Sequence, residues 1–139
     1  MALKVNGSII GYYHPVIETG LMMTNSEAAV EGRGYCLTSG RWTKAATTAA
    51  LEAICIKSSD AGTDVPAVME IVKTGDIIEA DYTGTPDVAF TPGLSVGVLD
   101  ANGDNVDAAT VTGGHLKIVG QDSSRKKVRL VAMKNYTAN

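Results

Sequence analysis

An alternation of apolar and polar residues on both sides of a Gly-Asp pair is the feature that most restricts the fold of this chain. In residues 65–86 (VPAVMEIVKTGDIIEADYTGTP), two short runs with apolar side chains at every second position flank Gly75 and Asp76. This pattern predicts a β-hairpin, and Gly75 suits its turn because glycine adopts a positive φ without a Cβ clash. The second run has one apolar face and one mostly polar face, which contain respectively Ile78, Ala80, Tyr82 and Ile77, Glu79, Asp81. We therefore expect an antiparallel sheet that packs on a core from one side.

The rest of the chain reads as further strands around this pair. With 15 glycines, one Phe and one Trp in 139 residues, the composition favours short strands and many turns over a helical bundle. Further strands are expected over residues 35–38, 51–57, 94–99, 116–119 and 127–133, while residues 45–51 could be helix or strand. The prediction is an all-β fold, a small β-barrel or sandwich of about six or seven short antiparallel strands.

Residues 1–33 lack a sustained period of 2 or 3.6, although they carry apolar and aromatic side chains. Such a segment is either a loosely wrapped cap on its own core or an arm that becomes ordered on a partner. The second interpretation is favoured, which divides the chain into an extended N-terminal arm, residues 1–33, and a β-domain, residues 34–139.

Charge is segregated along the chain. Residues 58–124 hold eleven acidic and two basic residues, whereas residues 125–139 hold five basic residues and no acidic one. The run RKKVR at 125–129 alternates with apolar residues like a strand, and the overall acidity argues against a nucleic-acid partner. No segment resembles a signal peptide, and no run approaches the ~20 apolar residues that a membrane span needs, so we expect a soluble protein made in the cytosol, without a membrane partner.

The sequence offers few groups for chemistry. Cys36 and Cys55 are too far apart for a zinc framework, so we expect two small buried side chains, and whether they pair is left open. The loop at residues 100–104 (DANGD) resembles a calcium loop, but its glycine stands at the fourth place and Val111 stands at the twelfth, where that loop has a glutamate. Glu79 and Asp81 share one face of a strand, as on any solvated strand. We expect no metal, no cofactor and no enzymatic activity.

Binding is the better-supported role. Tyr and Trp next to Arg are typical of interface anchors. The candidate contact residues for a partner or a second subunit are Tyr12, Tyr13, His14, Arg33, Arg41 and Trp42. Alternatively, Trp42 plugs the open end of the barrel.

The order of motifs from Gly34 to residue 134 resembles that of the head decoration, or cement, proteins of tailed bacteriophages. The motifs are Gly-Arg-Trp, the run AICIK, the stretch VPAVMEIVKTGDIIEADYTGTPDVAFTPG, the turn LDANGD and the final pair HLKIVGQDSSRKKVRLVAM. The resemblance implies a protein on the outer surface of the virion, often a homotrimer. Such a protein clamps adjacent major capsid protein subunits of an expanded icosahedral head against internal DNA pressure. It also implies an N-terminal arm that pairs with capsid strands.

Two other roles stay open at this point. One is a β-module that binds a small ligand or carbohydrate on a particle or cell surface, with a pocket near Trp42. The other is a small hydrolase that uses His115 with Asp122 or another nearby acid.

Overall fold

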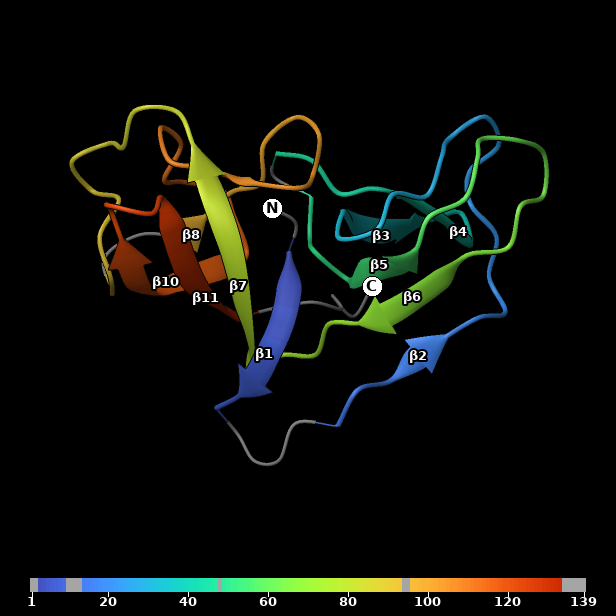
Figure 1. The fold of residues 1–139 in the computed structure, drawn as a ribbon, viewed down its shortest axis with the longest axis horizontal. Helices are drawn as coiled ribbons and strands as arrows, with labels where there is room; N and C mark the ends of the chain where they lie inside the picture. Colours follow the sequence, from blue (N-terminus) through green and yellow to red (C-terminus); the bar gives the residue numbers. More distant parts are fainter. Residues whose placement is uncertain (1–2, 10–13, 48, 94–95, 134–139) are drawn as a thin grey trace.

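The computed structural model describes residues 3–9, 14–47, 49–93 and 96–133, and this part of the chain contains strands and no helix (Figure 1). The strands are β1 (Lys4–Ser8), β2 (Ile17–Glu18), β3 (Gly34–Thr38), β4 (Arg41–Lys44), β5 (Ala53–Lys57), β6 (Val68–Ile71), β7 (Asp76–Thr83), β8 (Val96–Gly97), β9 (Val106–Asp107), β10 (Leu116–Asp122) and β11 (Lys127–Ala132). The predicted all-β class is confirmed. The structure has four strands beyond the seven expected: β1 and β2 from residues 1–33, β4, and the two-residue β9.

The strands form two sheets that do not close into a barrel, so the fold is sandwich-like. Sheet A has the antiparallel order β1-β7-β11-β10-β8, and β9 adds a parallel pair at the end of β7. Sheet B has the antiparallel order β2-β6-β5-β3-β4. In Figure 1, sheet A lies on the left and sheet B on the right.

The predicted hairpin around Gly75 is wrong. The two runs are strands, but β6 pairs with β2 and β5 in sheet B, whereas β7 pairs with β1 and β11 in sheet A. Residues 72–75 therefore cross from one sheet to the other. Gly75 does have the expected positive φ, 93°. The predicted inner face of β7 is confirmed, because Ile78, Ala80 and Tyr82 are buried.

Asp76 is buried at the crossover, on the same face of β7 as Ile78. Its carboxylate accepts a hydrogen bond from the Lys73 backbone N–H at 2.9 Å and lies 3.4 Å from the Lys73 ammonium. The neighbouring Gly75 donates to the carbonyl of Ala132 and accepts from the N–H of Ile9. The crossover therefore holds the ends of β1, β7 and β11 together.

The buried side chains form two cores. The larger one joins the sheets and includes Ile54 of β5, Ile78 of β7 and Leu130 of β11. The second lies on the other face of sheet B, because Ala53 and Cys55 alternate with Ile54 along β5. Its members are Met23, Ala29, Tyr35, Trp42, Ala53, Cys55, Ala67 and Met69.

The described part of residues 1–33 packs on the chain's own sheets. Leu3 belongs to the larger core, Met23 and Ala29 belong to the second, and β1 and β2 each pair with a strand of the body. The Tyr35 hydroxyl donates to the carbonyl of Ala28 at 3.0 Å and accepts from the N–H of Val30 at 2.9 Å. In this conformation the described residues are a cap on the core, the alternative to an extended arm.

The remaining expectations fall on loops and thiols. Residues 45–47 and 49–51 are neither helix nor strand apart from a single bridge between Thr47 and Leu99. In the described part of the expected strand at residues 94–99, residues 96–99, β8 forms, whereas residues 48, 94 and 95 lie outside the described residues. Cys36 and Cys55 are free thiols, and burial raises the pKa of both. No helix among the described residues has the length and apolar character to cross a membrane.

Candidate interaction surfaces

The structure does not gather the predicted contact residues on one surface. Trp42 is fully buried in the second core, so its ring is neither an exposed anchor nor a barrel plug. Its indole N–H has no hydrogen-bond partner in the described structure. His14 is exposed, and its carbonyl accepts a hydrogen bond from the Lys73 ammonium. Tyr12 and Tyr13 lie outside the described residues.

The two arginines of that group make contacts within the chain. Arg33 lies 3.7 Å from a carboxylate oxygen of Asp104. Arg41 pairs with Asp64 and donates to the carbonyl of Met23 at 3.0 Å. Arg41 therefore attaches the N-terminal segment to β4, where the sequence predicted a contact with a partner.

The outer face of sheet A, the face away from the core, has a regular ladder of side chains across β7 and β11. The facing residues are Asp81 with Lys127, Glu79 with Arg129, and Ile77 with Val131. We call these three pairs the outer ladder. The Lys127 ammonium lies 2.8 Å from the Asp81 carboxylate. Partial burial opposes ionisation of Asp81, but hydrogen bonding, including that from Lys127, outweighs it and lowers the pKa of this carboxyl.

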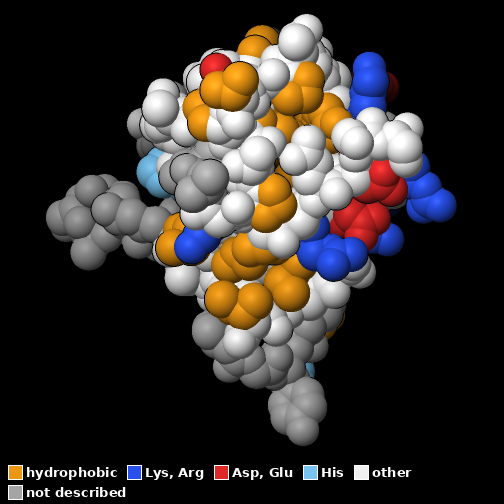
Figure 2. All heavy atoms as spheres, turned by 90° about the vertical axis from the view of Figure 1, so that its left-hand side faces the viewer, with side chains coloured by type: hydrophobic (Ala, Val, Ile, Leu, Met, Phe, Trp, Pro, Cys, Tyr) orange, Lys and Arg blue, Asp and Glu red, His pale blue; other side chains and the backbone are white. Residues whose placement is uncertain are grey.

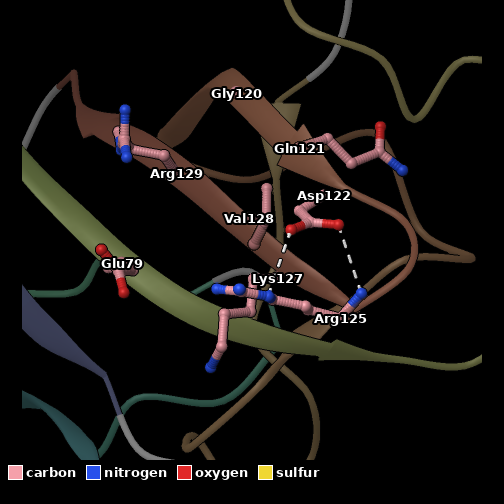
Figure 3. Close-up of a pocket in the computed structure, with 8 residues that line it drawn as sticks. All are labelled: Glu79, Gly120, Gln121, Asp122, Arg125, Lys127, Val128 and Arg129. Carbon is pink, nitrogen blue, oxygen red and sulfur yellow. Dashed lines mark hydrogen bonds and ion pairs between the residues drawn. The ribbon is translucent and has the colours of Figure 1, made fainter.

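A shallow depression of about 470 Å³ lies beside the charged part of the outer ladder (Figure 3). Its lining residues are Glu79, Gly120, Gln121, Asp122, Arg125, Lys127, Val128 and Arg129. Gly120 faces Arg129 across the strands and leaves space because it has no side chain. Asp122 closes the β10–β11 turn, and hydrogen bonds from the Ser124 hydroxyl and the Arg125 N–H lower its pKa. Most of its lining side chains are polar or charged, and it lies on sheet A, whereas the small-ligand alternative predicts a pocket near Trp42.

Apolar side chains occupy the other part of this outer face. Ile9, Val119 and Met133 are 62%, 45% and 51% exposed. Met133 lies two residues beyond Val131, whereas Val119 lies at the bulge opposite Arg129, and the β10 residue that faces Val131 is the exposed Lys117. Val119 has no facing residue because the register of β10 shifts between Ile118 and Gly120, as at a β-bulge. In Figure 2, which views the molecule from the left of Figure 1, charged side chains gather at one side of this face and hydrophobic ones lie beside them. A solvated sheet face is normally polar, so an apolar area here indicates a contact surface.

A second exposed apolar group lies at the edge of sheet B. Val16, Ile17 and Met22 are 48%, 47% and 36% exposed. β2 pairs with β6 on one side, and it is the outermost strand at the lower right of Figure 1. Its outer edge presents backbone groups that could pair with another strand.

Among the described residues there is no metal-binding group, and the two residues named for the hydrolase alternative, His115 and Asp122, do not come together. No group of three or more His, Cys, Asp or Glu side chains in this part of the chain could hold a metal ion. Asp100, the first residue of the calcium-like loop, accepts hydrogen bonds from the N–H groups of Asn102 and Gly103 and so closes a turn. His115 and Asp122 stand at opposite ends of β10, about 23 Å apart at the usual rise of a strand, which is too far for joint chemistry.

Sequence reasoning missed both apolar surfaces for identifiable reasons. Ile9 and Val16 lie in the segment that has no regular period, and Val119 was assigned to an ordinary strand. The detectable signal was Val119 followed by Gly120, since a glycine within a strand often marks a bulge. Comparison with protein-family models, with curated proteins and with solved structures finds no match to this chain.

Proposed function

We propose that this chain is a capsid decoration protein. It binds the exterior of an expanded phage head and clamps adjacent major capsid protein subunits. The motif resemblance from Gly34 onward supports this proposal, and the β-rich fold is compatible with it. The structural observation that carries it is the outer edge of β2, where apolar side chains accompany a strand that is paired on one side.

In this proposal the edge of β2 binds a capsid strand by β-augmentation. Backbone groups on the free side of β2 supply hydrogen bonds, and half-exposed Val16 and Ile17 supply apolar contact. Each contact is short, since β2 has two residues, so one site would bind weakly. Many equivalent sites on an icosahedral head make the total stabilisation large.

Cosedimentation tests the proposal. Purified protein is added to undecorated expanded heads of its own phage, and we expect it to sediment with them in a fixed ratio to the capsid subunit. The variant Val16→Lys/Ile17→Lys should lose this binding because two charges replace the apolar contact. Val88→Lys is the matched control, since Val88 is 96% exposed and distant in sequence from β2.

The outcomes separate the two parts of the proposal. If the wild-type protein stays in the supernatant at every concentration, capsid decoration is wrong. If the double variant binds as well as the wild type, decoration stands and the β2 edge is not the contact. Saturable binding of a carbohydrate, by protein that does not bind to heads, would favour the small-ligand alternative.

A further inference from the structure

We propose that the outer face of sheet A is a two-fold contact with a second copy of this chain. This proposal concerns a different sheet from the proposed capsid contact and does not depend on it. The argument begins with the outer ladder. Its acidic side chains, Glu79 and Asp81, both lie on β7, and its basic side chains, Arg129 and Lys127, both lie on β11.

This arrangement is complementary to itself under one rotation. A two-fold axis parallel to the strands, placed above the gap between β7 and β11, sets β7 of each copy over β11 of the other. Glu79 then faces the second copy's Arg129, and Asp81 faces its Lys127. The position along the strands is unchanged by this rotation, so half-buried Ile77 lies level with the second copy's Val131, a side chain that is itself 4% exposed.

The surroundings of the ladder fit the same contact. Val119 lies beside Arg129, and Met133 lies two residues beyond Val131, so burial of both adds apolar contact to the interface. Lys117, which faces Val131 on β10, stays at the exposed margin of this area. The rotation also brings β1 over β10. Lys4 is level with Glu79, and Gly120 is level with Arg129, so the second copy's Lys4 lies over the depression at Gly120, near Asp122. Aligned face-to-face packing of this kind is usual for two antiparallel sheets.

Charge reversal in separate samples provides the test. Glu79→Arg places two basic residues opposite each other in a homodimer, and Arg129→Glu does the same with two acidic residues. Neither variant should then dimerise. In an equimolar mixture, each molecule of one variant meets complementary charges on the other, so the mixture should form a heterodimer. Light scattering after size exclusion reports the mass, and the wild type should have twice the 14.5 kDa of the chain.

A second pair of variants tests the dimer contact without changing the charged residues of the outer ladder. Val119→Lys alters an exposed position on the interface and should give a folded monomer, whereas Val88→Lys, 96% exposed, should stay dimeric. Circular dichroism checks that each variant is folded. A wild type that is monomeric at every concentration, or trimeric as the phage resemblance implies, overturns the proposal. So does a mixture of the two charge variants that fails to associate, or a Val119→Lys protein that remains dimeric.

Discussion

Replacement of Tyr35 by Phe tests whether the N-terminal segment is part of the folded body. The Tyr35 ring is fully buried in the second core, and its hydroxyl bonds both the carbonyl of Ala28 and the N–H of Val30. Burial raises the pKa of this hydroxyl, so the group stays protonated and able to donate at neutral pH. Phe keeps the ring and removes only the two hydrogen bonds.

The expected loss follows from those two bonds. A buried polar group that loses its hydrogen-bond partner costs about 1–3 kcal/mol of stability. Ala28 and Val30 are half-buried, so water can replace part of the lost hydrogen bonding to their backbone groups. We expect Tyr35→Phe to lower the free energy of unfolding by about 2 kcal/mol in urea, which is a decrease of the melting temperature of about 4 °C or more for a chain of this size. Hydrogen exchange at residues 28–30 should become faster than in the wild type.

Tyr82→Phe is the matched control. Tyr82 is also buried and its ring lies against Phe90, but no hydrogen bond of its hydroxyl is present among the described residues. Its loss of stability should be clearly smaller. Equal stability of the Tyr35→Phe and wild-type proteins, with unchanged exchange at residues 28–30, would refute the cap and favour the interpretation of residues 1–33 as an arm.

The pH dependence adds an independent check on Tyr35. The native state resists ionisation of this hydroxyl, whereas the unfolded chain ionises it near pH 10. The stability due to protonated Tyr35 is thus fully present below about pH 10 and is lost as the pH rises further. The difference between wild type and Tyr35→Phe should therefore narrow above that pH. A constant difference up to pH 11 would mean that the hydroxyl is not buried as described.

Two further predictions concern backbone space and a surface ion pair. A Cβ on Gly114 would lie 1.9 Å from the Gly97 carbonyl oxygen, so Gly114→Ala should lower the free energy of unfolding by more than about 4 kcal/mol or prevent folding. Gly40 has φ 78° and open space around it, so Gly40→Ala should lower the free energy of unfolding by only about 1–2 kcal/mol. Urea denaturation measures both variants, and similar losses of stability would contradict the steric argument. Lys127→Met should lower the free energy of unfolding by less than about 1 kcal/mol at pH 7. Because the pKa of Asp81 is lowered in the native state, this difference in stability between wild type and variant should disappear as the pH falls below about 4. A stability difference that persists at pH 2 would exclude the ion pair as its cause.

The alternation along the chain predicted which face of a strand is buried better than it predicted which strands pair with each other. It correctly placed Ile78, Ala80 and Tyr82 in the core, because the direction of side chains along a strand is a local property. It could not show that β7 pairs with β11, about fifty residues away, because the alternation within a strand does not depend on which distant strand it pairs with. The same local pattern fits a hairpin and a crossover equally well. The burial of the Asp76 carboxylate is the clearest feature that the local pattern could not predict, because it depends on contacts that form only in the folded chain.

The packing of residues 3–9 and 14–33 changes how the proposed capsid contact has to be understood. An arm that becomes ordered on its partner loses conformational entropy at binding, which reduces affinity per unit of interface. Here Leu3, Met23 and Ala29 are already buried and β2 is already paired with β6, so this part of the cost is met during folding. A preformed edge can therefore bind with a short strand, as β2 is. It also follows that deletion of residues 1–30 would remove core side chains and two strands along with the contact, so only surface substitutions such as Val16→Lys/Ile17→Lys can separate binding from folding.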